Sequence, residues 1–96
     1  MNGLAVTEKN LEELIGRELG PTQWLTLDQS LIDRFAAVTG DEQWIHVDPA
    51  RAQAESPFGS TVAHGMLTLS LMPGEVLRLL DFSAFGLVIN YGLNRV

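Results

Sequence analysis

The spacing of hydrophobic residues predicts two helices in the first 40 residues of the chain. Residues 7–19 place four apolar side chains on one helical face, with Thr7 as the N-cap and Gly20–Pro21 as the stop: Leu11, Leu14, Ile15 and Leu19. Residues 28–39, "DQSLIDRFAAVT", repeat Leu31, Phe35 and Val38 at helical spacing. Asp28 can cap this second helix and Gly40 ends it.

Between these helices and toward the end of the chain, the pattern changes to that of strands. Residues 22–27, "TQWLTL", combine aromatic and β-branched side chains and predict a strand. Residues 85–96, "FGLVINYGLNRV", predict another, with Gly86 and Gly92 at bulge positions. We therefore expect two strands.

A long apolar segment separates the middle of the chain from the last strand. Residues 63–80, "AHGMLTLSLMPGEVLRLL", are apolar on almost every side, which is typical of a buried helix, and Pro73–Gly74 predict a kink. Just before it, Asp48–Pro49 should cap and open a short helix over residues 49–55. Two strands are too few to cover the long helix, so we expect another chain or a longer parent protein to supply the missing layer.

Composition narrows the function classes. The 96 residues fit one domain, and 46% of them are hydrophobic, as in a globular protein. The net charge is −6 and the six basic residues are scattered, which argues against nucleic acid as a partner. The absence of cysteine excludes disulfides, thiolate zinc sites and cysteine nucleophiles. We expect a cytoplasmic protein with no membrane partner, because neither a signal peptide nor a span is recognisable.

Candidate chemistry lies in residues 40–49, "GDEQWIHVDP". Asp41 and His46 are five positions apart, so on a helix they would point about 140° apart, and on a strand they would lie on opposite faces. The two side chains can therefore meet only if the segment is an irregular turn, which Gly40 and Asp48–Pro49 permit. Taken alone, the segment is better explained as a solvated loop that Trp44 and Ile45 anchor to the core.

Other readings of these residues are weaker. Asp48 is explained as a helix cap by the proline that follows it. A metal site made of Asp41, His46 and Asp48 has suitable ligand types but no recognised spacing. A serine hydrolase is disfavoured because the chain has no "GxSxG" segment.

The ordered run "RFAAVTGDEQWIHVDPARAQAESPFGSTVAHGML" resembles the MaoC-like (R)-specific enoyl-CoA hydratases. In these, a helix leads to Gly-Asp, a turn, a His, an Asp-Pro helix and then Ala-His-Gly-Met. The similarity extends from Phe35 to about Leu71, and a weaker similarity is present in residues 89–96, "INYGLNRV". Gln43 and Trp44 stand where the commoner pattern has Asn and Pro, which is similar to the NodN-like branch.

The resemblance implies an α+β hot-dog fold, in which a curved antiparallel sheet wraps a long central helix from His64 to about Leu80. This 1–96 chain would form a single hot-dog domain that lacks the C-terminal strands. The resemblance also implies that Asp41 and His46 are the catalytic pair. They would activate one water for reversible hydration of trans-2-enoyl-CoA to the (R)-3-hydroxyacyl-CoA in fatty acid metabolism.

Four further residues acquire substrate-binding roles by the same resemblance. The backbone N–H of Gly65 would bind the thioester carbonyl, and Gln43 would orient the water or the pair. His64 would have a hydrogen-bonded structural or site-lining role. Asn90 would line the acyl or pantetheine path, and a polar residue of an edge strand is an equal alternative for it. The implied partners are an acyl-CoA thioester and a second copy of the chain, in a dimer or higher homo-oligomer, with no cofactor or metal.

Two other functions on the same fold remain open from the sequence. The short chain suggests a non-catalytic module that binds acyl thioesters or serves in assembly. A thioesterase would differ from a hydratase by releasing free CoA.

Overall fold

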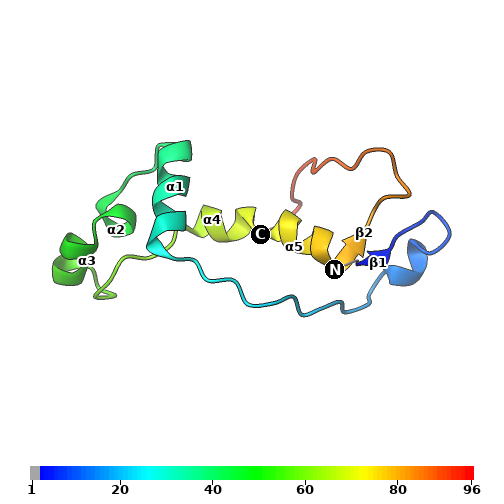
Figure 1. Cartoon of the computed structure of the whole chain (residues 1–96), viewed down its shortest axis with the longest axis horizontal. Coiled ribbons are helices and arrows are strands. Elements are labelled where there is room, and N and C mark those ends of the chain that lie inside the picture. The colour runs from blue at the N-terminus through cyan, green and yellow to red at the C-terminus, as the bar shows by residue number, and fades with distance from the viewer. Residues whose placement is uncertain (1–2) are drawn as a thin grey trace. The chain divides into compact units, whose positions relative to one another are not determined.

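A computed structural model describes residues 3–96 as a mixture of helices with a small sheet (Figure 1). The chain divides into two compact units. One unit is Trp24–Leu71, and the other combines the chain up to Gln23 with Met72–Val96. We describe each unit by itself.

In the unit Trp24–Leu71, the helix predicted over residues 28–39 is confirmed as α1 (Gln29–Thr39). The side chain of Asp28 accepts a hydrogen bond from the backbone N–H of Leu31 at 2.9 Å, as expected of an N-cap. At the other end, Gly40 takes the left-handed conformation with φ of 81° and its N–H donates to Ala36. Both ends of α1 are therefore set by local residues.

The buried face of α1 differs from the predicted one. Ile32 and Ala36 are buried, whereas Val38 is 85% exposed. Val38 lies two residues beyond Ala36, about 200° around the helix, so it cannot share the buried face. Val38 therefore lies off the buried face, although it repeats at helical spacing with Leu31 and Phe35.

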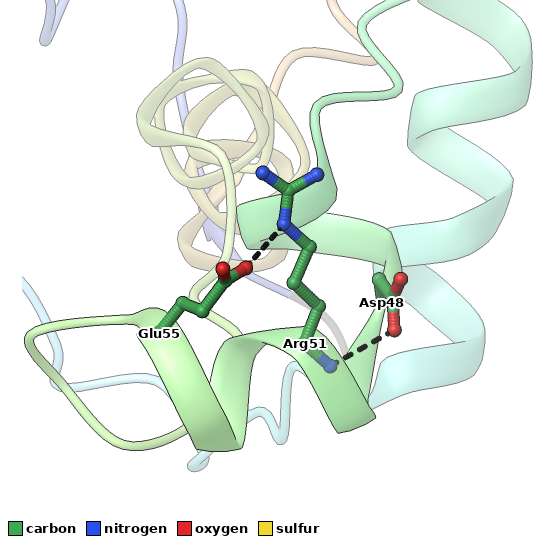
Figure 2. A network of polar contacts seen from close by, with 3 residues as sticks. All are labelled: Asp48, Arg51 and Glu55. Carbon is green, nitrogen blue, oxygen red and sulfur yellow. Dashed lines mark hydrogen bonds and ion pairs between the residues drawn. The ribbon is translucent and has the colours of Figure 1, made fainter.

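Three short helices complete this unit: α2 (Trp44–Val47), α3 (Pro49–Glu55) and α4 (Gly65–Ser70). The predicted cap is confirmed, because the carboxylate of Asp48 accepts from the N–H of Arg51 at 3.1 Å (Figure 2). The Arg51 side chain pairs with Glu55 at 2.5 Å and lies 4.4 Å from the centre of the Trp44 ring. The contact of Arg51 with Trp44 ties α3 to α2.

The other unit contains a two-stranded parallel sheet, with β1 (Leu4–Ala5) beside β2 (Leu80–Asp81). Val6 follows β1, is buried, and donates its N–H to the carbonyl of Asp81 at 2.8 Å. The carboxyl of Asp81 accepts hydrogen bonds from Ser83. The bond from the backbone N–H has the larger effect and the bond from the side chain the smaller, and together they hold the pKa of Asp81 below the ordinary 3.8.

The first predicted helix does not form over residues 7–19. Instead, a turn is followed by one turn of 3₁₀-helix, η1 (Glu12–Leu14), and Gly16 has a φ of 80° that a continuing helix cannot contain. Ile15 is exposed, so the amphipathic face has little to pack against. A helix this short is unstable without such packing.

The predicted long helix is helical but interrupted earlier than expected. α4 ends at Ser70 and α5 (Met72–Leu79) begins after Leu71, so Pro73 occupies the first turn of α5. Proline fits a first turn because its missing N–H would have no intrahelical partner there. The predicted burial on almost every side was wrong, since Met66 is 64% and Leu77 is 60% exposed.

The two predicted strands are also absent. Residues 22–27 and 85–96 contain no strand, and both Trp24 and Tyr91 are fully exposed. A strand needs a hydrogen-bonded neighbour, and within residues 3–96 the one strand pair is β1 with β2. No helix in this described range is long and apolar enough to cross a membrane.

Candidate active site

The segment between α1 and α2 places Asp41 at the start of the candidate site. Gly40 turns the chain out of α1, and the N–H of Asp41 contacts the Thr39 hydroxyl at 3.3 Å. Helix α2 then begins after Gln43, so Asp41 lies on a loop and His46 on a single helical turn. The sequence predicts an irregular turn, and the structure has a loop followed by this short helix.

His46 is held by the backbone of the segment that leads to α4. Its Nδ1 lies 2.8 Å from the carbonyl oxygen of Val62, and the N–H of Val62 donates to the carbonyl of Ile45 at 3.1 Å. A carbonyl only accepts, so Nδ1 carries the hydrogen. In the neutral ring, Nε2 of His46 therefore offers a lone pair to a ligand.

His64 lies next to His46 and is only 3% exposed. Its Nε2–H donates to the backbone carbonyl of Asp41 at 2.9 Å. Its ring stacks on that of His46, with centroids 3.8 Å apart and planes 23° apart, and Phe35 packs edge-on at 5.0 Å. His64 thus contacts both members of the predicted pair.

The structure brings Asp41, His46 and His64 together. One side-chain nitrogen or oxygen from each of the three lies within 4.8 Å of the others. Asp41 is exposed, His46 is half-buried and His64 is buried, so the cluster runs from solvent into the unit. Two of these groups can accept a hydrogen bond near solvent, the Asp41 carboxylate and, in the neutral ring, Nε2 of His46.

The cluster has the ligand types of a zinc or iron site but not the geometry of one. A metal bound at about 2.0–2.1 Å from two imidazole nitrogens must lie near both ring planes. The rings of His46 and His64 are stacked and almost parallel, so an ion in the plane of one lies off the plane of the other. Asp48, the third ligand of the metal site weighed from the sequence, instead caps α3.

Sequence reasoning missed Gln29, the first residue of α1. Its Nε2 donates to the carbonyl of His46 at 2.7 Å and to Asp33 at 2.9 Å, and its Oε1 accepts from the Thr61 hydroxyl at 2.6 Å. No local pattern marks Gln29, because two of these partners are 17 and 32 residues away. Only the folded chain shows that Gln29 links α1 to both sides of the site.

The remaining predicted site residues are placed as follows. Gln43 is exposed, and its carbonyl accepts from the N–H of His46 at 2.9 Å. Gly65 is the exposed first residue of α4, and a Cβ there would meet nothing within 4 Å. Asn90 is exposed and lies in the other compact unit, outside any strand.

The class of protein is defined by comparison with known families. The family model described as "MaoC like domain" matches residues 10–96, which is most of the chain. The chain therefore belongs to the MaoC-like domain family, as the ordered run from Phe35 to Leu71 predicts.

Curated relatives place it further within this family. It is 45% identical over 97 residues to Nodulation protein N of Rhizobium meliloti, covering 95% of this chain and 57% of that protein. It is 51% identical to Nodulation protein N of Rhizobium leguminosarum bv. viciae, and the match covers 85% of this chain and 52% of that protein. It is also 46% identical to 3-hydroxyacyl-thioester dehydratase Z of Mycobacterium tuberculosis, covering 91% and 57%. The chain spans about half the length of these relatives.

Proposed function

We propose that this chain carries the hydration site of an enoyl-CoA hydratase, a hydro-lyase that interconverts trans-2-enoyl-CoA and (R)-3-hydroxyacyl-CoA. The observation that supports it is the approach of Asp41 and His46, in a family where one relative is named a 3-hydroxyacyl-thioester dehydratase. Dehydration of a hydroxyacyl thioester and hydration of an enoyl thioester are one reaction in opposite directions.

The chemistry follows from the two acceptors. A water molecule has two hydrogens, and the Asp41 carboxylate and His46 Nε2 can accept one each, which fixes its oxygen toward the β-carbon of the substrate. As that oxygen bonds to the β-carbon, one of the pair takes its proton. The carbon–carbon double bond becomes an enolate. The α-carbon then gains one proton, delivery of which is governed by the other member of the pair and which replaces the proton taken from the water, so that the whole water molecule has been added.

The enolate oxygen requires hydrogen-bond donors. We assign this role to the backbone N–H of Gly65, in line with the family resemblance. Gly65 is exposed, and an added Cβ would meet no group within 4 Å beyond its own neighbours and helix backbone, so no other segment crowds this residue. Gln43 as the residue that orients the water, and Asn90 as part of the acyl path, stay predictions.

The proposal extends to the complete domain. We infer that the full domain takes the hot-dog arrangement around residues 64–80. The exposed apolar side chains of α4 and α5 support this, since a sheet would cover them.

Adding water leaves the net oxidation state of the substrate unchanged, so the reaction needs no redox cofactor.

The test is an enoyl-CoA hydration assay on wild type, Asp41→Asn and His46→Gln. Each variant should lower kcat by about 10²–10⁴-fold, because each removes a proton acceptor from the water. Asp48→Asn is the matched control, since it changes an acid of the same segment that caps α3 and Asn also caps helices. A wild type that is inert at every acyl chain length, or activity retained in both variants, would refute the proposal.

Two further measurements separate the other functions. Release of free CoA in place of hydration would indicate a thioesterase. Calorimetric titration that shows acyl-CoA binding without turnover would indicate a non-catalytic binding module.

A further inference from the structure

We propose that His64 is a positioning residue of the hydration site, which holds Asp41 through its Nε2–H and the ring of His46 through stacking. The inference rests on the proposed function and adds a third residue to the pair. It concerns how the pair is held, and it assigns His64 no contact with the reacting atoms.

The first support is the bond from His64 to the loop that carries Asp41. That loop is exposed, and the backbone N–H of Asp41 makes only a long contact of 3.3 Å to the Thr39 hydroxyl. The 2.9 Å bond from His64 Nε2 to the Asp41 carbonyl is the better of the two, and it comes from a buried side chain. His64 therefore holds the backbone from which the Asp41 side chain projects.

The second support is the position of the His46 ring. One edge is fixed by the bond from Nδ1 to Val62, and one face is covered by the ring of His64 at 3.8 Å. An edge and a face together prevent the ring from rotating out of place. With the edge bond alone, the ring could tilt about it, and Nε2 would no longer point steadily at the water.

The third support is a polar atom that has no partner. Nδ1 of His64 is buried and makes no hydrogen bond with any described residue. A buried acceptor without a donor destabilises the fold, so an apolar ring would suit this place better on packing grounds alone. A polar ring at such a position is typical of residues kept for function, and here the opposite nitrogen supplies the bond to Asp41.

Two variants separate the donor from the ring. His64→Gln keeps an N–H at the reach of Nε2 but loses the flat face, whereas His64→Phe keeps the face and loses the donor. Leu67→Ala is the matched control, because Leu67 is a buried apolar residue of α4, the helix that follows His64 directly. It lowers stability without removing either contact.

The experiment measures kcat, KM and melting temperature for the three variants, with the ¹⁵N shifts of the His46 ring nitrogens. Both His64 variants should lower kcat about tenfold or more, as expected when a reacting group is displaced, with KM changing much less. The melting temperature of His64→Phe should fall less than that of Leu67→Ala. In wild type the ¹⁵N shifts should show the Nδ1–H form of His46. His64→Gln, which loses the stacked face, should show a mixture of forms, whereas His64→Phe, which keeps the face, should keep the single form.

The two proposals fail in distinguishable ways. An inert wild type refutes the hydratase function, and the ¹⁵N shifts then still decide the role of His64. If His46 keeps a single form in both His64 variants, His64 does not position it. The positioning role is also refuted if an active wild type and both variants share the same kcat, or if kcat falls only as the folded fraction falls in Leu67→Ala.

Discussion

Three backbone carbonyls at the candidate site each accept a hydrogen bond from a side chain elsewhere in the chain. The carbonyl of His46 accepts from the Gln29 side chain. The carbonyl of Val62 accepts from Nδ1 of His46, and that of Asp41 accepts from Nε2 of His64. The donors come from α1, from α2 and from the residue before α4. Side chains thus replace the sheet or helix bonds that these loop carbonyls lack, and each donor contributes to the position of the pair.

At the residue scale, Gln29→Met should lower the free energy of unfolding by about 1–3 kcal/mol, because it removes the donor to His46 and the acceptor for Thr61. Thr61→Val removes only one of these bonds and should have a smaller effect. Urea denaturation measures both. Ser30→Ala, on the neighbouring exposed residue, is the control and should change stability by less than about 0.5 kcal/mol. Equal stability of Gln29→Met and wild type would contradict this account.

The sequence predicts some residues of the site and not others, for a physical reason. Asp41 and His46 are close in the chain, so their spacing alone indicates that they meet if the segment turns. The stack of His46 on His64 joins residues that are 18 positions apart, and no local pattern encodes it. The contact of Phe35 with His64 cannot be predicted either. The helical spacing of Phe35 predicts that it is buried, but it does not identify the imidazole against which Phe35 packs.

At the element scale, the end of α1 depends on one backbone conformation. Gly40 has a φ of 81°, and an added Cβ would meet nothing within 4 Å, so the effect of Gly40→Ala is conformational alone. It should destabilise the protein by about 1–2 kcal/mol, and Gly40→Asn by less. Thermal or urea unfolding measures the change.

A glycine-to-alanine substitution at Gly74 serves as the control, because it should change the stability of the protein in the opposite direction. Gly74 lies inside α5, where the backbone is helical and an added Cβ meets nothing within 4 Å. Gly74→Ala should stabilise the protein by about 0.5–1 kcal/mol. If both substitutions shift stability in the same direction, the left-handed conformation of Gly40 does not govern the end of α1.

The elements that the sequence predicts correctly carry their own end signals. α1 has Asp28 and Gly40, and α3 has Asp48 with Pro49, so local chemistry defines both. The predicted strands over residues 22–27 and 85–96 need neighbours to bond with, and composition cannot state whether these are present. For this reason α1 and α3, which carry local end signals, are predictable and the sheet is not.

At the scale of the whole molecule, we expect self-association. Large apolar side chains are exposed in both compact units, including Trp24 in one and Leu77 in the other. Exposed apolar surface of this kind favours contact with another copy. Light scattering after size exclusion should give a mass of at least two chains, falling toward one on dilution. A stable monomer at every concentration would exclude this expectation.

The hydrogen bonds and ring contacts of the candidate site all lie within the continuous segment Trp24–Leu71, and the most distant bonded residues, Gln29 and Thr61, are 32 positions apart. Contacts between residues near in the chain form quickly, because little loop entropy is lost in making them. The cluster can therefore form without waiting for contacts with residues outside this segment.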